Sequence, residues 1–457
     1  MLLHPHQKQI ASSQSRFKVI RGGRRSGKSS VEIETMLFKA VSEKDRNVFY
    51  IAPTQKQARS IIWEALKARI GKIGVPNESR LEMRVPAKGK GHSTIFIAGW
   101  ENRENFRGMK AHHITFDEVD TMKDFFIGWQ EIFRPALLDT TGTADFIGTP
   151  KKENPNLRRL EKEESVTSFH FTSIDNPSLP REELKKAQEE MDADTYRQEI
   201  LAEYVDNAGS LFKYTALVDM FSNTITKNIE KFLVIDVADD GSDKTVFSFW
   251  EGLEMYRIEQ FERLNTESII NQTREYAADQ RIPYSQIAVD AIGVGAGVAS
   301  SSLLDGIVGY KSSYGAMRTE QDPTRLPNVH YRENAPLITE YKNLRSQCVF
   351  TLAGLVNDHK IAVRATDIRI KERIIEELAL YQDVSAGDGK RMATQKEDIV
   401  ALLGRSPDLS DTLVMRMYFE IRARLSPHQS EAKAEIYGKI MRQFSSNEQN
   451  LHHETNK

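Results

Sequence analysis

Short apolar runs alternate with amphipathic stretches through the first 150 residues of the chain. The runs have the length of buried strands, and the stretches carry apolar residues three and four positions apart, as helices do. Strands that alternate with helices form parallel sheets. We therefore expect a parallel α/β sheet, with strands at 17–20, 47–53, 93–100, 112–118 and 144–150 and helices at 31–43 and 55–70.

A second α/β pattern follows a charged helical stretch over residues 179–204. At Lys231 a new apolar run begins, and further strand-like runs follow it. From residue 426 the chain has few apolar residues, which is typical of a frayed helix or a tail. The expected organisation is an α/β domain over 1–205, a linker over 206–230, a second α/β domain over 231–425 and a polar C-terminal tail over 426–457.

The composition limits the kinds of protein that this chain could be. Its 457 residues are too many for one ordinary domain. A formal charge of -2 excludes a permanently coated nucleic-acid binder, although a local basic stripe could still contact DNA. One cysteine excludes an internal disulfide framework and fits a reducing compartment. No apolar run reaches the ~18 residues of a membrane span, so we expect a soluble intracellular protein without a membrane partner.

The segment from Gly22 to Ser29 (GGRRSGKS) fits the phosphate-loop pattern GxxxxGK[ST] between an expected strand and an expected helix. Glycines such as Gly22 and Gly27 let backbone N–H groups face phosphate, and the helix N-terminus adds positive potential. Lys28 is expected to reach the β- and γ-phosphates of ATP, and the Ser29 hydroxyl to bind Mg²⁺. This pattern predicts an ATP site.

Other residues are candidates for the same site. Asp117 and Glu118 follow the run at 112–116, where the first acid would hold the magnesium of ATP and the second would activate water. An acidic strand-to-loop turn is the alternative. Thr149 could sense the γ-phosphate or simply end a strand, and Gln7 could bond adenine or lie at the surface.

Several arginines could stabilise the charge that develops on phosphate during hydrolysis. Arg24 and Arg25 lie inside the phosphate loop and are counted among the ATP-binding candidates. Arg107 and Arg134 lie farther along the chain. The sequence does not say which one acts, nor whether it acts within one subunit or across two.

Three dispersed aspartates predict a second, metal-dependent site. Asp236 and Asp290 each end an apolar strand, and Asp411 lies at the start of an apolar helix. Clustered carboxylates need cations, and oxygen-only ligands favour Mg²⁺ or Mn²⁺, here two ions that could cleave a phosphodiester. Each acid has a plainer alternative: Asp236 and Asp290 as loop caps and Asp411 as a helix N-cap, although Asp408 suits that cap better.

Two further features near these aspartates stay ambiguous. Asp243 is either a turn residue or an accessory ligand. Lys390, Arg391 and Lys396 lie beside a glycine-containing hairpin at 385–389, and they form either a DNA-backbone contact or a solvated charged loop.

The order of these motifs, as far as about residue 425, resembles the large terminase subunit of tailed bacteriophages. The resemblance includes Asp175–Leu179 (DNPSL), Gly209–Phe212 (GSLF) and the ending Leu403–Asp411. It implies an ASCE-type P-loop ATPase joined to an RNase H-like nuclease. Lys28, Ser29, Asp117 and Glu118 match the family's ATPase motif, Thr149 its coupling motif, and Asp236, Asp290 and Asp411 its nuclease triad. The chain departs from the family at His112, His113 and Thr115, which interrupt the apolar strand before Asp117.

The resemblance also implies a function and partners. The protein would hydrolyse ATP to translocate double-stranded DNA into a procapsid and would cleave concatemeric DNA. It would act in the host cytoplasm as a homo-oligomeric ring, a pentamer by resemblance, docked transiently on the portal protein and assisted by a small terminase subunit.

Two other readings of the same motifs stay open. One is an ATPase-nuclease of DNA repair or transposition, although no helicase-like second motor or DNA-reading module is recognisable. The other is a catalytically silent prophage assembly protein, against which the intact Lys28, Glu118 and three aspartates argue.

Overall fold

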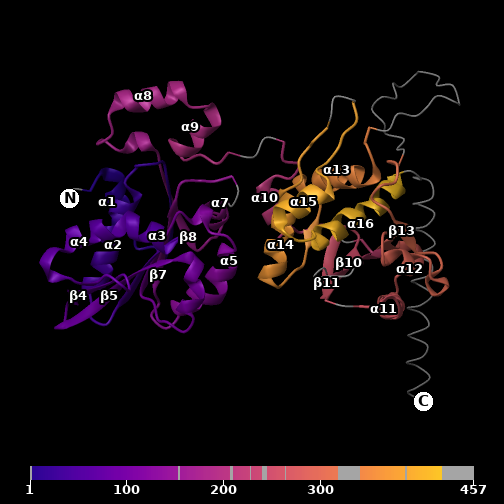
Figure 1. Cartoon of the computed structure of the whole chain (residues 1–457), viewed down its shortest axis with the longest axis horizontal. Helices are drawn as coiled ribbons and strands as arrows, with labels where there is room; N and C mark the ends of the chain where they lie inside the picture. Colours follow the sequence, from indigo (N-terminus) through magenta and orange to yellow (C-terminus); the bar gives the residue numbers. More distant parts are fainter. Residues whose placement is uncertain are drawn as a thin grey trace, which may run out of the picture. The chain divides into compact units, whose positions relative to one another are not determined.

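The computed structural model describes residues 3–152, 155–205, 209–226, 228–238, 244–262, 264–317, 340–385 and 389–424. The chain divides into two compact units, residues 1–207 and 208–457, and each is considered by itself (Figure 1). Asp243, the expected tail at 426–457 and the middle of the hairpin at 385–389 lie outside the described residues.

The first unit contains an eight-stranded sheet. Its strands are β1 (Phe17–Gly22), β2 (Asn47–Ala52), β3 (Val75–Asn77), β4 (Glu82–Ala87), β5 (Gly91–Gly99), β6 (His113–Asp117), β7 (Thr143–Gly148) and β8 (Val166–Phe171). They lie in the order β3-β4-β5-β2-β6-β7-β1-β8. From β5 to β8 all neighbours are parallel, which confirms the expected sheet, and β3 and β4 add an antiparallel edge.

Two different clusters of buried side chains pack on the two faces of this sheet. The helices of the unit are α1 (Pro5–Ser12), α2 (Lys28–Val41), α3 (Gln55–Ala58), α4 (Glu64–Ile70), α5 (Phe125–Gly128), α6 (Arg134–Ala136), α7 (Asn156–Leu160), α8 (Arg181–Glu190) and α9 (Ala193–Glu199). Met36 and Ala40 of α2 pack with Tyr50 and Trp63 in one buried cluster. Alternate residues of a strand face opposite sides, so Phe116 of β6 joins a separate aromatic cluster, where it stacks on Phe146 of β7.

The second unit contains a six-stranded mixed sheet. Its strands are β9 (Lys231–Asp236), β10 (Thr245–Glu251), β11 (Glu254–Phe261), β12 (Ile287–Asp290), β13 (Val308–Tyr310) and β14 (Ala362–Val363), in the order β13-β12-β9-β10-β11-β14. β10 runs antiparallel to β9 and β11, whereas β12 and β13 run parallel to β9. Counting the first five strands along the chain, their spatial order is 5-4-1-2-3, which is the RNase H-like arrangement. The expected fold class is confirmed.

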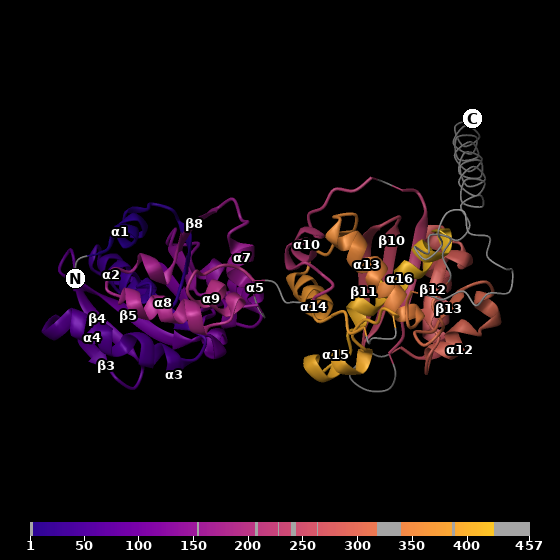
Figure 2. The ribbon, with the colours of Figure 1, turned by 90° about the horizontal axis from the view of Figure 1, so that it is seen from above.

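One long helix crosses this second sheet. The helices of the unit are α10 (Tyr214–Asp219), α11 (Thr266–Gln280), α12 (Gly295–Ala299), α13 (Leu344–Asn357), α14 (Ile368–Ala379), α15 (Lys396–Leu403) and α16 (Asp408–Arg424). Figures 1 and 2 both show α13 and α16 side by side, and α16 packs on β9 and β10. Arg416 of α16 is fully buried, with its guanidinium 3.7 Å from the centre of the Phe232 ring.

The segment expected to be a linker, residues 206–230, is largely part of the second unit. It contains α10, whose Ala216 and Leu217 are buried together with Phe212 and Met220 in the main core of that unit. The sequence pattern concealed this helix because it is short and is flanked by polar residues. The boundary between the units therefore lies near residue 207, and the second unit begins well before β9.

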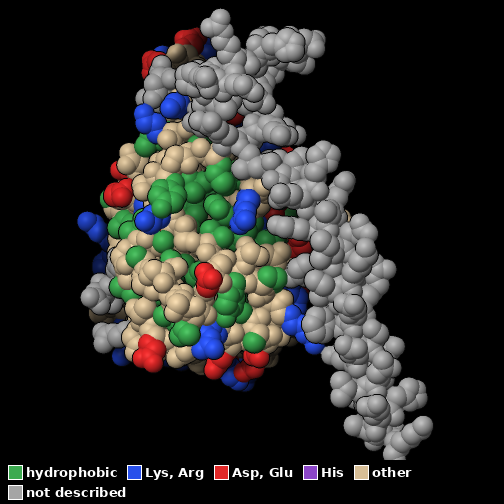
Figure 3. Space-filling view, turned by 90° about the vertical axis from the view of Figure 1, so that its right-hand side faces the viewer, with side chains coloured by type: hydrophobic (Ala, Val, Ile, Leu, Met, Phe, Trp, Pro, Cys, Tyr) green, Lys and Arg blue, Asp and Glu red, His purple; other side chains and the backbone are tan. Residues whose placement is uncertain are grey.

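Among the described residues no helix could span a membrane, and the coloured side chains visible in Figure 3 form no basic stripe. No helix within the described parts of the chain is long and apolar enough to cross a bilayer. On the face of the α12–β13 side, the coloured atoms show Lys and Arg scattered among apolar and acidic side chains (Figure 3). Between the end of β12 and the residues that follow β13, the exposed apolar side chains include Ile292, Leu303 and Tyr314.

A glycine substitution tests the close approach between α12 and β12. A Cβ on Gly295 would lie 1.8 Å from the backbone oxygen of Asp290, so Gly295→Ala should destabilise the second unit by roughly 1–3 kcal/mol or more through overpacking. Gly354→Ala in α13 is the matched control, since its Cβ would meet nothing within 4 Å, and alanine there should stabilise the helix by about 0.5–1 kcal/mol. Denaturant unfolding measures both; equal effects would refute the clash.

Candidate functional sites

The loop between β1 and α2 is fixed from outside by the chain around β8 and α9. Arg24 N donates to Glu199 O at 2.8 Å, and Ser173 Oγ donates to Arg24 O at 2.7 Å. A Cβ on Gly23 would lie 2.3 Å from Ile200 O, so only glycine fits there. Arg25 and Gly27 have left-handed backbones, with φ of 56° and 94°. These turns shape the loop around a concave backbone surface suited to an anion.

Lys28 places a buried ammonium group inside this loop. Its Nζ donates to Gly22 O at 2.7 Å, to Gly23 O at 3.0 Å and to Thr149 Oγ1 at 3.1 Å. All three partners are uncharged. Burial lowers the pKa of Lys28, and the nearby Glu118 and Asp117 partly oppose that shift. A buried cation held only by neutral oxygens is a good partner for phosphate.

Asp117 is buried at the carboxyl end of β6. Its Oδ2 accepts hydrogen bonds from Ser29 Oγ, at 3.4 Å, and from Tyr50 Oη, and its Oδ1 accepts from Glu118 N at 2.9 Å. Burial raises the pKa of Asp117 to about 6, and the Glu118 charge adds to the effect. Ser29 and Asp117 are thus close enough to serve one magnesium ion, with Asp117 acting through a water as the sequence pattern predicts.

Glu118 has a left-handed backbone, with φ of 56° and ψ of 47°. For a residue other than glycine this conformation costs about 1–2 kcal/mol. It persists where surrounding structure enforces it, and such positions cluster at functional sites. The turn at Glu118 redirects the chain directly after Asp117, at the same sheet edge as the phosphate loop.

The remaining ATP-site candidates are placed differently. Thr149 lies against Lys28 and also donates to Gly22 O at 3.0 Å. Gln7 is buried and bonds to protein, since its Nε2 donates to Gly27 O at 3.1 Å and its Oε1 accepts from His4 N at 2.9 Å. It therefore supports the loop. Arg24 is paired with Glu199 but stays mostly exposed.

The two other arginine candidates contact other parts of the unit. Arg107 pairs with Glu104 and Glu131. The guanidinium of Arg134 lies 4.7 Å from the centre of the Phe17 ring, at the start of β1, whereas the phosphate loop follows the end of that strand.

In the second unit the three dispersed aspartates line one pocket. Its volume is about 540 Å³, and Asp236, Asp290 and Asp411 are among its walls, together with Asp408. β9 and β12 are adjacent and parallel, so their carboxyl ends, at Asp236 and Asp290, meet at one edge. α16 begins at Asp408 and presents Asp411 from its first turn. The structure therefore brings together residues that are 54 and 121 positions apart in sequence.

Two basic side chains lie among these acids. Lys396 Nζ is 2.6 Å from Asp411 Oδ2, and an Arg345 guanidinium nitrogen is 3.8 Å from Asp411 Oδ1. Burial lowers the pKa of Lys396, but the Asp411 and Asp236 charges outweigh it and raise the pKa above its ordinary value. Burial also raises the pKa of Asp236, with the Asp411 and Asp290 charges adding to the rise and Lys396 opposing it.

The start of α16 depends on a residue that the sequence did not single out. Ser410 N donates to Glu377 Oε2 at 2.7 Å, and Glu377 is paired with Arg405. Asp408 Oδ2 accepts a hydrogen bond from Lys244 N at 3.3 Å, which joins the helix to the start of β10. These contacts orient the first turn of α16 and so the carboxylate of Asp411. Nothing in the spacing of Glu377 along the sequence pointed to this role.

The pocket fits divalent cations by the chemistry of its donors. The anionic groups are carboxylates, and such oxygen ligands suit Mg²⁺ and Mn²⁺. Within the described residues, one group of His, Cys, Asp and Glu has ligand atoms that all lie within 4.8 Å of one another, and it is Glu32, His113 and Asp145 of the first unit. The pocket aspartates are thus spaced more widely, as expected for acids that repel one another.

The chain is similar to large terminase subunits of bacteriophages. Residues 19–219 match the family model described as the N-terminal part of the terminase large subunit, T4likevirus-type. The large terminase subunits of Thermus phage G20c and Thermus virus P23-45 are each 23% identical over 350 residues, which cover 66% of this chain and 72% of theirs. A solved large terminase from a thermophilic bacteriophage is 14% identical, with a TM-score of 0.42 over 92% of this chain and 99% of that one.

The sequence matches agree with the motif order along the chain. The matched range begins within β1, includes the phosphate loop, Asp117, Glu118 and Thr149, and ends in α10. The chain therefore contains, over residues 19–219, an N-terminal domain of the terminase large subunit family, and it is similar to phage large terminase subunits over 350 residues.

Proposed function

We propose that this protein is the motor and nuclease of a viral DNA-packaging machine: it hydrolyses ATP to move double-stranded DNA into a procapsid and cleaves concatemeric DNA. The observation that supports the proposal best is the convergence of two complete sets of side chains. Lys28, Ser29 and Asp117 lie together at one sheet edge, and Asp236, Asp290 and Asp411 line one pocket at another.

In the ATPase reaction the protein positions ATP and accepts a proton. Lys28 would exchange its carbonyl partners for the β- and γ-phosphates, while backbone N–H groups of the loop surround the phosphate chain. Ser29 and Asp117 would hold the Mg²⁺ that accompanies ATP. Glu118 accepts a proton from the attacking water as a bond forms to the γ-phosphorus and the bond to ADP breaks. Thr149, in contact with Lys28, would register whether the γ-phosphate is present.

In the cleavage reaction the second unit holds DNA phosphate beside its carboxylates. Asp236, Asp290 and Asp411 would bind two Mg²⁺ or Mn²⁺ ions, which supply an activated water and stabilise the leaving oxygen. Before the ions bind, Lys396 contacts Asp411 and compensates part of the negative charge of the pocket. Asp408 fixes the helix start, and Gly295 lets α12 approach the end of β12.

Assembly is part of the same proposal. A homo-oligomeric ring, a pentamer in this scheme, would encircle double-stranded DNA on the portal protein in the host cytoplasm, and a small terminase subunit would deliver the DNA. Arg24 and Arg25, whose side chains are exposed at the phosphate loop, are the arginines best placed to meet a neighbouring subunit or the nucleotide.

The ATPase assignment predicts different losses for two variants. Lys28→Ala should lose both ATP binding and hydrolysis, because the buried cation is removed. Glu118→Gln should still bind ATP but hydrolyse it about 10²–10⁴-fold more slowly, because only proton transfer is lost. Phosphate release and binding of a fluorescent ATP analogue measure these effects.

Glu43→Gln is the control for those two variants, since Glu43 is an exposed acid of the same unit that pairs with Arg46. It should behave as the wild type. An unchanged turnover rate in Glu118→Gln would remove Glu118 from the mechanism.

The nuclease assignment predicts metal-dependent nicking of plasmid DNA by the full chain. EDTA should abolish nicking and Mn²⁺ should restore it. Asp236→Asn and Asp411→Asn should each abolish it with folding preserved, because each removes a carboxylate that would bind a cation.

Asp358→Asn provides the matched control, because Asp358 is an exposed aspartate of the same unit that pairs with Lys360. Full nicking by Asp411→Asn, at a wild-type melting temperature, would reassign Asp411 to helix capping alone.

A further inference from the structure

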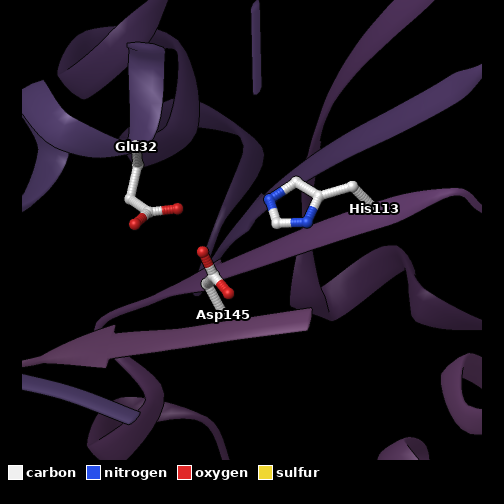
Figure 4. Close-up of side chains that lie close together, drawn as sticks. All are labelled: Glu32, His113 and Asp145. Atoms are coloured by element: carbon white, nitrogen blue, oxygen red, sulfur yellow. The ribbon is translucent and has the colours of Figure 1, made fainter. Parts of the chain in front are cut away.

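A cluster of polar side chains lies buried beneath the phosphate loop. Glu32 of α2, His113 of β6 and Asp145 of β7 are all fully buried, and Figure 4 shows their polar ends directed toward one another. Lys18 of β1 completes the cluster, with its Nζ 2.8 Å from Asp145 Oδ2. Nothing in the proposed ATPase or nuclease chemistry uses these groups.

Hydrogen bonds assign a defined state to His113. Thr115 Oγ1 donates to Glu32 Oε2 at 2.9 Å, so its lone pair accepts from His113 Nε2 at 3.2 Å. His113 Nδ1 then accepts from Thr143 Oγ1 at 2.8 Å. Both ring nitrogens are used in a neutral imidazole, in keeping with burial, which lowers the pKa of His113 to about 4. A metal ion would have to break one of these bonds and share Asp145 with Lys18.

Three oxygens of the cluster lack a hydrogen-bond partner: Glu32 Oε1 and both carboxylate oxygens of Asp145, of which Oδ2 forms the ion pair with Lys18. Unpartnered buried carboxylate oxygens are costly, and a proton on Glu32 removes one of the two negative charges. Burial and the Asp145 charge raise the pKa of Glu32 well above its ordinary value, which agrees with a protonated Glu32. The cluster is then neutral, with Lys18 balancing Asp145.

The cluster connects the two elements that carry the candidate magnesium ligands. Glu32 lies one turn beyond Lys28 and Ser29 on α2, and Thr115 lies two residues before Asp117 on β6, hence on the same face of the strand. The Thr115–Glu32 hydrogen bond therefore lies directly below the contact between Ser29 and Asp117. Directional bonds of this kind hold a helix against a strand more specifically than apolar packing does.

We propose that Glu32 and Thr115 are positioning residues of the ATP site: their hydrogen bond holds α2 against β6 so that Ser29 and Asp117 converge on the magnesium of ATP. This inference rests on the proposed ATPase function. It explains why the polar residues His113 and Thr115 interrupt an otherwise apolar strand.

Three variants of the full chain test the proposal. Thr115→Val removes the hydroxyl and keeps the shape, and it should raise the Mg²⁺ concentration for half-maximal ATP hydrolysis on the order of fivefold, the factor that one buried hydrogen bond supplies. ATP-analogue binding in EDTA should stay unchanged. Thr115→Ser restores the hydroxyl and should restore the wild-type Mg²⁺ dependence. Glu32→Gln should also resemble wild type, because its amide oxygen accepts from Thr115 and its NH₂ group replaces the carboxyl proton of Glu32.

Thr35→Val is the matched control. Thr35 is a buried threonine of α2 whose hydroxyl bonds only along its own helix, to Val31 O at 3.1 Å, so this variant should leave the Mg²⁺ dependence unchanged. An unshifted Thr115→Val, or an equal shift in Thr35→Val, would overturn the proposal.

Two further outcomes separate the remaining alternatives. Stoichiometric metal in the purified wild type, detected by mass spectrometry and absent from Glu32→Gln, would replace the proton on Glu32 with a metal centre and overturn the proposal. A wild-type chain that neither binds nor hydrolyses ATP would defeat the proposed function, and this inference with it. Wild-type hydrolysis with an unshifted Thr115→Val would defeat the inference alone.

Discussion

Parallel pairing of adjacent strands is the constraint on which both candidate sites depend. Parallel neighbours end at the same sheet edge, so side chains that follow them meet although they are distant in sequence. In the first unit this constraint brings the phosphate loop after β1, Asp117 at the end of β6 and Thr149 after β7 to one edge. In the second unit it joins Asp236 to Asp290 through β9 and β12. A helix adds the remaining groups: α2 provides Lys28 and Ser29, and α16 provides Asp411.

The two candidate sites differ in the sign of the charge that they present to a ligand. At the phosphate loop a buried ammonium, Lys28, is held by neutral oxygens and fits an anionic ligand. In the second pocket, aspartates gather around Lys396 and Arg345 and fit cationic ligands. Buried charge is expensive unless it is paired. Each site therefore keeps a protein partner close to its charged group, and a ligand could take over that partner's place.

Much of this arrangement could be predicted from the sequence, because strand-ending acids and a phosphate loop are local signals. Asp236 and Asp290 each follow an apolar run, and knowing that β9 and β12 are parallel is enough to bring them together. Lys396 could not be assigned, because its position beside Asp411 depends on how α15 and α16 pack, and a lysine near a glycine-containing hairpin has the pattern of a solvated loop. The role of Glu377, which lies on α14 and caps the start of α16, could not be predicted for the same reason.

The proposed nuclease requires that the carboxyl edge of the second sheet bind divalent cations. The most direct measurement is the anomalous scattering of Mn²⁺ in crystals of the full chain soaked with that ion. Density is expected between Asp236, Asp290 and Asp411, with Lys396 displaced from its contact with Asp411. Crystals that bind Mn²⁺ only elsewhere, with Lys396 still against Asp411 Oδ2, would contradict this requirement.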